Sequence, residues 1–207
     1  MADDTILEVK RFSGSQLNEY IADVARLRIE VFREFPYLYD GSMAYEEKYL
    51  QTYVQCPQAV VVLAFADDRV VGASTGIPML FEEENFRRPF SEHGYDPAGV
   101  FYCAESVLEK MYRGRGLGVR FFEEREAHAR QLGSFAYYAF CSVVRPDHHP
   151  LKPLDHVPLD AFWQKRGYTK HPEIRASYTW KDIDKKEDTS KVLEFWLKSA
   201  VPSPAGD

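Results

Sequence analysis

Apolar residues recur along the chain with the spacing of helices in some segments and of strands in others. Between Leu17 and Val31 they are three or four residues apart, which predicts an amphipathic helix that ends near Pro36. Further helices are predicted at residues 43–55, 116–132 and 159–166.

Runs of β-branched and aromatic residues predict the strands. The apolar runs 59–66 and 69–77 flank Asp67 and Asp68, which predicts a hairpin. Other strands are predicted at residues 5–11, 100–108, 135–144, 168–170, 175–183 and 192–197. Because strands and helices do not alternate in regular βα units, this order predicts an α/β (α+β) fold, a mixed sheet of six to seven strands with helices on both faces.

No linker rich in proline and serine divides the sequence, so we expect a single domain over residues 1–207. Of the 207 residues 45% are apolar and 28% charged, which is typical of a soluble globular protein. The polar and aromatic segment 81–99 is long enough to be a lid-like insertion, or simply an extra helix and loop. Residues 199–207 are expected to form a flexible tail.

The charge balance and the apolar pattern argue against several classes of protein. A formal net charge of −6 disfavours a general affinity for nucleic acid and suits a cationic small molecule instead. The longest apolar run is too short to span a bilayer, and the first residues lack the pattern of a secretory signal, so we expect no membrane association and a cytoplasmic location. The three cysteines lack C-x-x-C spacing and indicate no metal site, and Cys103 and Cys141 are expected to pack in the core.

Three closely spaced glycines join a predicted strand to a predicted helix at Gly114, Gly116 and Gly118. The first N–H groups of a helix have no intrahelical partner, the helix dipole adds positive charge there, and glycines let an anion come close. Three basic residues surround the same turn, namely Arg113, Arg115 and Arg120. The segment therefore predicts a phosphate-binding turn, although the glycines could also serve only a tight connection.

The position of this turn in the chain separates the kinds of phosphate site. A dinucleotide fold usually carries its glycine fingerprint on the first βα turn, with an acidic residue about 20 residues onward. Here the turn lies halfway along the chain, and the next predicted strand ends in Val143-Val144-Arg145. The sequence also lacks G-x-x-x-x-G-K-[ST], which excludes a P-loop.

Three motifs follow one another in an order typical of one superfamily. The strand Glu105-Ser106-Val107-Leu108 leads into R-x-x-G-x-G at residues 113–118, and the later segment 162–168 has the pattern aromatic, polar residues, glycine, aromatic. The hairpin with Arg69-Val70-Val71-Gly72 precedes both. Over residues 5–183 the chain resembles the GNAT superfamily of acyl-CoA-dependent N-acyltransferases. The resemblance implies a mostly antiparallel mixed sheet with a splayed pair of parallel strands that holds acyl-CoA.

The same resemblance implies that acetyl-CoA is the co-substrate. Backbone N–H groups of the glycine turn would hold its pyrophosphate, and the strand before the turn would pair with its pantetheine arm. The implied turn residues are Arg113, Gly114, Arg115, Gly116, Leu117, Gly118 and Val119. The implied strand residues are Val107, Leu108 and Glu109.

The predicted proton chemistry rests on Glu105 and departs from the family at Trp163. An amine attacks as the neutral form, which for a lysine-like amine at pH 7 lies about 4–5 kcal/mol uphill. Glu105 is the acidic residue best placed to act as general base, or it merely caps a partner or faces solvent. In the family the general acid is usually a tyrosine, and here that position is Trp163, whose indole cannot play that role at neutral pH. Trp163 would instead pack against the cofactor or fill the core.

The acceptor side is expected to come from the first two helices and the loops at the open end of the sheet. Tyr37, Tyr39 and Asp40 would form an aromatic cage with one carboxylate for a cationic amine, or they would staple the helix end to the sheet. His149, beside His148, would touch substrate or serve as an alternative base, or it would lie on the surface.

Together these features predict an N-acetyltransferase that moves an acetyl group from acetyl-CoA to a primary amine of a small molecule or protein. The amine would attack directly in a ternary complex. Two other functions stay open: a non-catalytic acyl-CoA sensor, which the tryptophan at 163 favours, and a nucleotide-dependent enzyme that uses the turn for another diphosphate. No nucleic-acid partner is expected, and the resemblance allows a homodimer.

Overall fold

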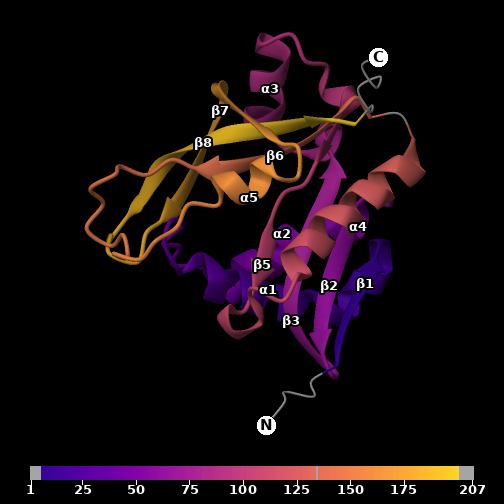
Figure 1. Cartoon of the computed structure of the whole chain (residues 1–207), viewed down its shortest axis with the longest axis horizontal. Coiled ribbons are helices and arrows are strands. Elements are labelled where there is room, and N and C mark those ends of the chain that lie inside the picture. The colour runs from indigo at the N-terminus through magenta and orange to yellow at the C-terminus, as the bar shows by residue number, and fades with distance from the viewer. Residues whose placement is uncertain (1–5, 134, 201–207) are drawn as a thin grey trace.

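The computed structural model describes residues 6–133 and 135–200, and it places eight strands in one strongly twisted sheet (Figure 1). Along the sheet the order is β1-β2-β3-β4-β6-β8-β7, and β5 also pairs with β3. All paired strands are antiparallel except β4 and β6, which are parallel. The strands are β1 (Leu7–Phe12), β2 (Val60–Ala66), β3 (Arg69–Pro78), β4 (Val100–Tyr102), β5 (Ser106–Leu108), β6 (Tyr137–Val143), β7 (Thr169–Lys181) and β8 (Asp188–Ser199).

Helices cover both faces of this sheet (Figure 1). One face packs against α1 (Ile21–Phe32), α2 (Met43–Gln55) and α3 (Glu84–Glu92). The other face packs against α4 (Leu117–Leu132) and α5 (Asp160–Gln164). Short 3₁₀ turns are η1 (Gly14–Tyr20), η2 (Met79–Phe81), η3 (Pro97–Gly99) and η4 (Lys110–Tyr112).

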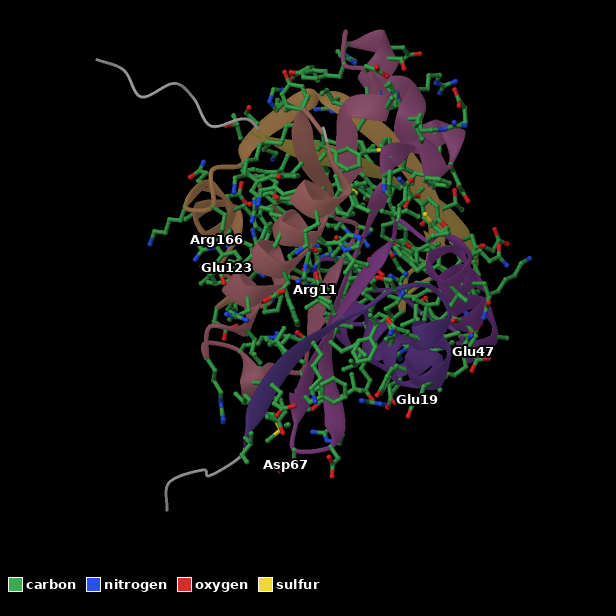
Figure 2. All side chains as sticks on the ribbon, turned by 90° about the vertical axis from the view of Figure 1, so that its right-hand side faces the viewer. Arg11, Glu19, Glu47, Asp67, Glu123 and Arg166 are labelled. Carbon is green, nitrogen blue, oxygen red and sulfur yellow. The ribbon has the colours of Figure 1, made fainter. Side chains whose placement is uncertain are left out.

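The strand β2 shows why the sheet needs cover on both sides. Its side chains alternate, so that Val61 and Leu63 pack toward α1 and α2 while Val60 and Val62 pack toward α4. All of these side chains are buried. Charged side chains such as Glu19, Glu47 and Glu123 lie outside this core, and Asp67 marks the tip of the β2–β3 hairpin (Figure 2).

The predicted fold class is confirmed, with two differences in detail. The sheet has eight strands among the described residues, because the predicted strand 100–108 is broken into β4 and β5 and the predicted strands 168–170 and 175–183 join in one strand, β7. Segment 81–99 forms η2, α3 and η3, and Phe86 and Phe90 of α3 are buried in the core. A lid role for this segment stays a prediction. Residue 5 of the first predicted strand and residues 201–207 of the predicted tail lie outside the described residues.

The break between β4 and β5 is held by hydrogen bonds to a single carbonyl. The Glu105 carbonyl accepts from the Thr75 N–H at 3.0 Å, the Ser74 hydroxyl at 2.9 Å and Nη1 of Arg125 at 3.1 Å. Arg125 lies on α4, is 1% exposed, and forms no ion pair with a described residue. Its guanidinium also lies over the ring of Phe122, 4.8 Å from the centroid. The helix α4 thus fixes the break from the far side of the sheet.

We expect Arg125→Met to destabilise the protein by about 1.5–3 kcal/mol, because the variant loses charge-assisted hydrogen bonds to buried carbonyl groups. Urea unfolding followed by circular dichroism measures the change. Arg120→Met is the control, since Arg120 is exposed on the same helix and pairs only with neighbouring glutamates at 2.9 and 3.9 Å. Equal stability of both variants would contradict the role given to Arg125.

Candidate active site

The parallel strands β4 and β6 separate at the break. They pair from Val100 with Tyr137 to Tyr102 with Ala139, and the last bond between them joins the Cys103 N–H to the Ala139 carbonyl at 2.7 Å. Beyond this point β5 pairs with β3 within the described chain, while β6 continues along β8. In the described chain β5 and β6 therefore do not pair, and we call this interruption of the hydrogen-bond ladder the opening between β5 and β6.

Backbone groups of β5 point into this opening at alternate residues. The Thr75 N–H donates to the Glu105 carbonyl, and the Glu109 N–H donates to the Val71 carbonyl. In an antiparallel ladder with these bonds, the N–H group of Val107 also points toward β3, whereas the N–H groups of Ser106 and Leu108 point away from it. Of the three strand residues predicted to hold pantetheine, Leu108 therefore turns its N–H toward the opening, and Val107 and Glu109 turn theirs toward β3.

The glycine turn follows β5 through η4 and starts α4. Gly114 and Gly116 have φ angles of 78° and 85°, in the left-handed region that favours glycine. A Cβ on either residue would meet no atom within 4 Å, so the backbone at this turn is approachable from outside. The carbonyl of Gly116 accepts the first helical bonds, from the Val119 and Arg120 N–H groups. This geometry fits the phosphate cradle predicted at residues 113–119.

The arginines around the turn bind acidic and aromatic side chains of the protein itself. Arg113 pairs with Glu34 at 2.9 Å and donates through Nε to the Leu108 carbonyl at 3.1 Å. Arg120 pairs with Glu124, and the Arg115 guanidinium lies 5.5 Å from the centre of the Tyr112 ring. The Arg113 side chain thus braces the end of β5, and a phosphate-binding role of the turn stays a prediction.

Trp163 packs against the α4–α5 face of the sheet. Its ring lies 5.0 Å from the centroids of both Phe140 and Trp196. The neighbouring Tyr168 is buried, and its hydroxyl donates to Glu126 at 3.1 Å. The contacts of Trp163 are those of a core side chain, and contact with a cofactor stays a prediction.

A cavity of about 470 Å³ lies on the opposite face, where the strands part. Tyr102, Ala104 and Glu105 from the break and Cys141 from β6 line it. Aromatic side chains form much of its wall, including Phe32, Tyr37, Tyr39, Tyr49, Phe86 and Trp180. We call this space the aromatic cavity.

Carboxylates outnumber basic groups in the lining of the aromatic cavity. The acidic residues are Asp40, Glu46, Glu82, Glu83, Glu105 and Asp188. The basic residues are Arg28 and Lys181. Negative charge and aromatic faces together favour a cationic ligand, because both attract positive charge.

Arg28 of α1 organises the inner end of the aromatic cavity. It forms ion pairs with Glu46 of α2 and with Glu105, and its guanidinium lies 4.2 Å from the centre of the Tyr49 ring. The side chains of Arg28, Glu46 and Glu105 are 10%, 0% and 8% exposed, and the Tyr49 hydroxyl donates to Glu105 at 3.3 Å. Glu105 therefore lines the cavity as the partner of Arg28 in a buried ion pair. A role as general base stays a prediction.

The predicted acceptor residues reach the aromatic cavity because Arg145 holds their loop. Its guanidinium donates to the carbonyls of Pro36 and Tyr37 at 2.7 and 2.6 Å and pairs with Asp182 at 2.7 Å. Tyr37 and Tyr39 thus stand in the wall, and burial raises the pKa of both hydroxyls.

Asp40 lines the aromatic cavity, whereas His149 lies apart from it. Hydrogen bonds from Lys181 and Arg33 lower the pKa of Asp40, so its charge is already balanced at the rim. The His149 ring packs near Phe35, 5.9 Å between centroids, and His149 is not among the described residues that line the aromatic cavity.

Several lining residues were not predicted from the sequence. Burial and the nearby Glu105 raise the pKa of Glu82 to about 7, and the hydroxyl of Tyr102 lies 3.0 Å from Sγ of Cys141. Burial raises the pKa of that thiol to about 12, so it is uncharged at neutral pH. The sequence signal for Glu82 was its place shortly after the apolar strand β3. Glu105 and Arg28, which act on its pKa, come from distant segments.

Among the described residues, no cluster of His, Cys, Asp and Glu side chains is arranged to hold a metal ion. None of the helices there is both long and apolar enough to cross a membrane.

No protein-family model and no curated protein matches the sequence, whereas many solved structures match the fold. A GNAT-family acetyltransferase of Streptococcus pneumoniae superposes with a TM-score of 0.56 at 15% identity, covering 94% of this chain and 99% of the other. The PaiA N-acetyltransferase of Thermoplasma acidophilum, in complex with coenzyme A, superposes with a TM-score of 0.55 at 14% identity, covering 94% of this chain and 99% of the other. A Salmonella typhimurium protein solved with its cofactor acetyl-CoA superposes with a TM-score of 0.59 at 10% identity, covering 97% of this chain and 98% of the other. The chain therefore has the fold of the GNAT superfamily of acetyltransferases.

Proposed function

We propose that the protein transfers an acetyl group from acetyl-CoA to a primary amine of a small molecule or protein. The observation that carries this proposal is the opening between β5 and β6, which ends at a cavity lined by aromatic rings and an excess of carboxylates. Structures with this fold include proteins solved with acetyl-CoA or coenzyme A, which supports the choice of donor.

The donor would occupy the opening. Backbone N–H groups at the glycine turn would bind the pyrophosphate, and the N–H groups of Ser106 and Leu108 would bind the pantetheine arm. The thioester would then lie beside Tyr102 and Cys141, where the strands part. In this arrangement the acyl carbon would lie beside the aromatic cavity.

The acceptor would enter from the α1–α2 face. An ammonium group is attracted by the aromatic faces and the carboxylates, and the cavity has the size of a small-molecule site. Direct attack by the neutral amine on the thioester needs no enzyme nucleophile, in keeping with the uncharged Cys141 thiol. The resulting thiolate is a good leaving group, since the pKa of a thiol is near 8.5.

Purified protein should bind acetyl-CoA in calorimetry and release coenzyme A thiol when one member of a panel of primary amines is added. Binding without thiol release from any amine would favour the acyl-CoA sensor, to which the tryptophan at position 163 gives some weight. Binding of NAD or ATP in place of acetyl-CoA would refute the proposed donor.

We expect Gly116→Ala to weaken acetyl-CoA binding by about tenfold or more, equivalent to about 1.4 kcal/mol, because a methyl group would stand between the anion and the backbone. Gly94→Ala is a matched control. Gly94 has φ +81°, close to the +85° of Gly116, and neither Cβ would meet an atom within 4 Å. Both variants should lose similar stability, and calorimetry should show weaker binding in Gly116→Ala alone. Equal affinities would count against the phosphate cradle.

Arg28→Met should destabilise the protein by about 3–5 kcal/mol, because two buried carboxylates lose their shared partner. At temperatures where it stays folded, the variant should still bind acetyl-CoA and should acetylate amines poorly, since Arg28 lies on the acceptor side only. Urea unfolding, calorimetry and thiol release measure these three properties. Arg33→Met, which removes an exposed ion pair with Asp40, should change the stability by less than about 1 kcal/mol.

A further inference from the structure

Two carboxylates share one guanidinium at the inner end of the aromatic cavity, and a third lines the same cavity. Arg28 forms ion pairs with Glu46 and Glu105, and Glu82 forms no ion pair with a described residue. Glu82 is half-buried, and burial and the charge of Glu105 disfavour its charged form. A proton or a cationic ligand beside Glu82 is therefore favoured.

The backbone places Glu82 where the proposed reaction would occur. Glu82 follows η2, and its N–H donates to the Met79 carbonyl at 3.0 Å. Its side chain lines the aromatic cavity together with Tyr102 and Cys141, the residues at the parting of β4 and β6. A group at this point can reach both an incoming amine and the thioester region.

Charged and titratable groups from every neighbouring element act on Glu82. They are Arg28 of α1, Tyr49 and Tyr53 of α2, Tyr102 of β4, Glu105 of the break, Cys141 of β6 and the adjacent Glu83. Burial and the charges of Glu105 and Glu83 raise the pKa of Glu82, and Arg28 lowers it, with a balance of about 7. The carboxyl therefore exchanges a proton readily at neutral pH, as an efficient general base does.

We propose that Glu82 is the general base that takes a proton from the acceptor ammonium before the amine attacks the thioester. The assignment rests on the proposed acetyl transfer. The Glu82 carboxylate and R–NH₃⁺ become a carboxylic acid and R–NH₂. The nitrogen then forms a bond to the acyl carbon, the C–S bond breaks, and the thiolate takes the second proton from nitrogen. Glu82 returns its proton to water, so that one proton is released in each turnover.

Glu82 suits this step better than Glu105 does. Protonation of Glu105 would break its buried ion pair with Arg28 and leave the guanidinium with one carboxylate partner fewer. Protonation of Glu82 breaks no ion pair, and it relieves the repulsion between Glu82 and Glu105. Glu105 and Arg28 then act as positioning residues for the wall of the aromatic cavity.

The test compares Glu82→Gln with Glu84→Gln, a change of the same size at an exposed residue of α3 that is not among the described residues lining the aromatic cavity. Two acceptors are used: the fastest primary alkylamine of the panel, which is protonated at pH 7, and aniline, which is already neutral there. For the alkylamine, we expect kcat/KM of Glu82→Gln to fall by about 100-fold or more. The rise of wild-type kcat/KM near pH 7 should also disappear. With aniline, Glu82→Gln should keep most of the wild-type rate, and Glu84→Gln should resemble wild type with both acceptors.

A second measurement needs no turnover. The pKa of Glu82 in the folded protein is higher than the ordinary value of 4.5, so the protonated carboxyl stabilises the fold at low pH. This stabilisation is lost as the pH rises through 7. The Tm of Glu82→Gln relative to wild type should therefore rise between pH 4 and pH 8. Three outcomes would overturn the assignment to Glu82 but not the proposed function. They are wild-type kcat/KM of Glu82→Gln with the alkylamine, equal losses of kcat/KM with both acceptors, and a Tm difference that does not depend on pH. A wild-type protein that binds no acetyl-CoA would overturn the proposed function and this assignment together.

Discussion

The interruption of one strand between Tyr102 and Ser106 is the constraint on which the candidate site depends. A continuous strand would pair with β6 along its whole length and close the sheet. The Glu105 carbonyl is instead held by two groups of β3 and by the buried Arg125 of α4. This leaves the N–H groups of Ser106 and Leu108 without a strand partner on the β6 side. Tyr102, Ala104 and Glu105, at the interruption, also line the aromatic cavity.

Charge is distributed differently in the two halves of the site. Around the glycine turn, Arg113 and Arg120 are paired with glutamates, and backbone dipoles supply the positive potential. In the aromatic cavity the acids exceed the bases, and the inner end carries three carboxylates for one arginine. A donor with a diphosphate and an acceptor with an ammonium group would each meet the opposite charge. In the proposed function the break would therefore lie between the side that binds the anionic donor and the side that binds the cationic acceptor.

Local patterns predicted much of this fold, and contacts between distant residues decided the rest. The helix at 43–55 and the glycine turn at 114–118 follow from spacing and from the conformational freedom of glycine. The break within 100–108 could not be predicted, since Cys103 and Ala104 suit a strand and the contact that interrupts it comes from Arg125, 20 residues away from Glu105. The ion pair of Glu105 with Arg28 and the raised pKa of Glu82 likewise arise from helices and turns far apart in the sequence.

Amide hydrogen exchange of β5, with and without acetyl-CoA, tests the central claim most directly. In the free protein the Val107 and Glu109 amides should exchange slowly, because they bond to β3, whereas the Ser106 and Leu108 amides should exchange faster. Acetyl-CoA should slow exchange at Ser106 and Leu108 and leave Val107 and Glu109 unchanged. Protection of Ser106 and Leu108 already in the free protein, or exchange there that acetyl-CoA does not alter, would contradict the account.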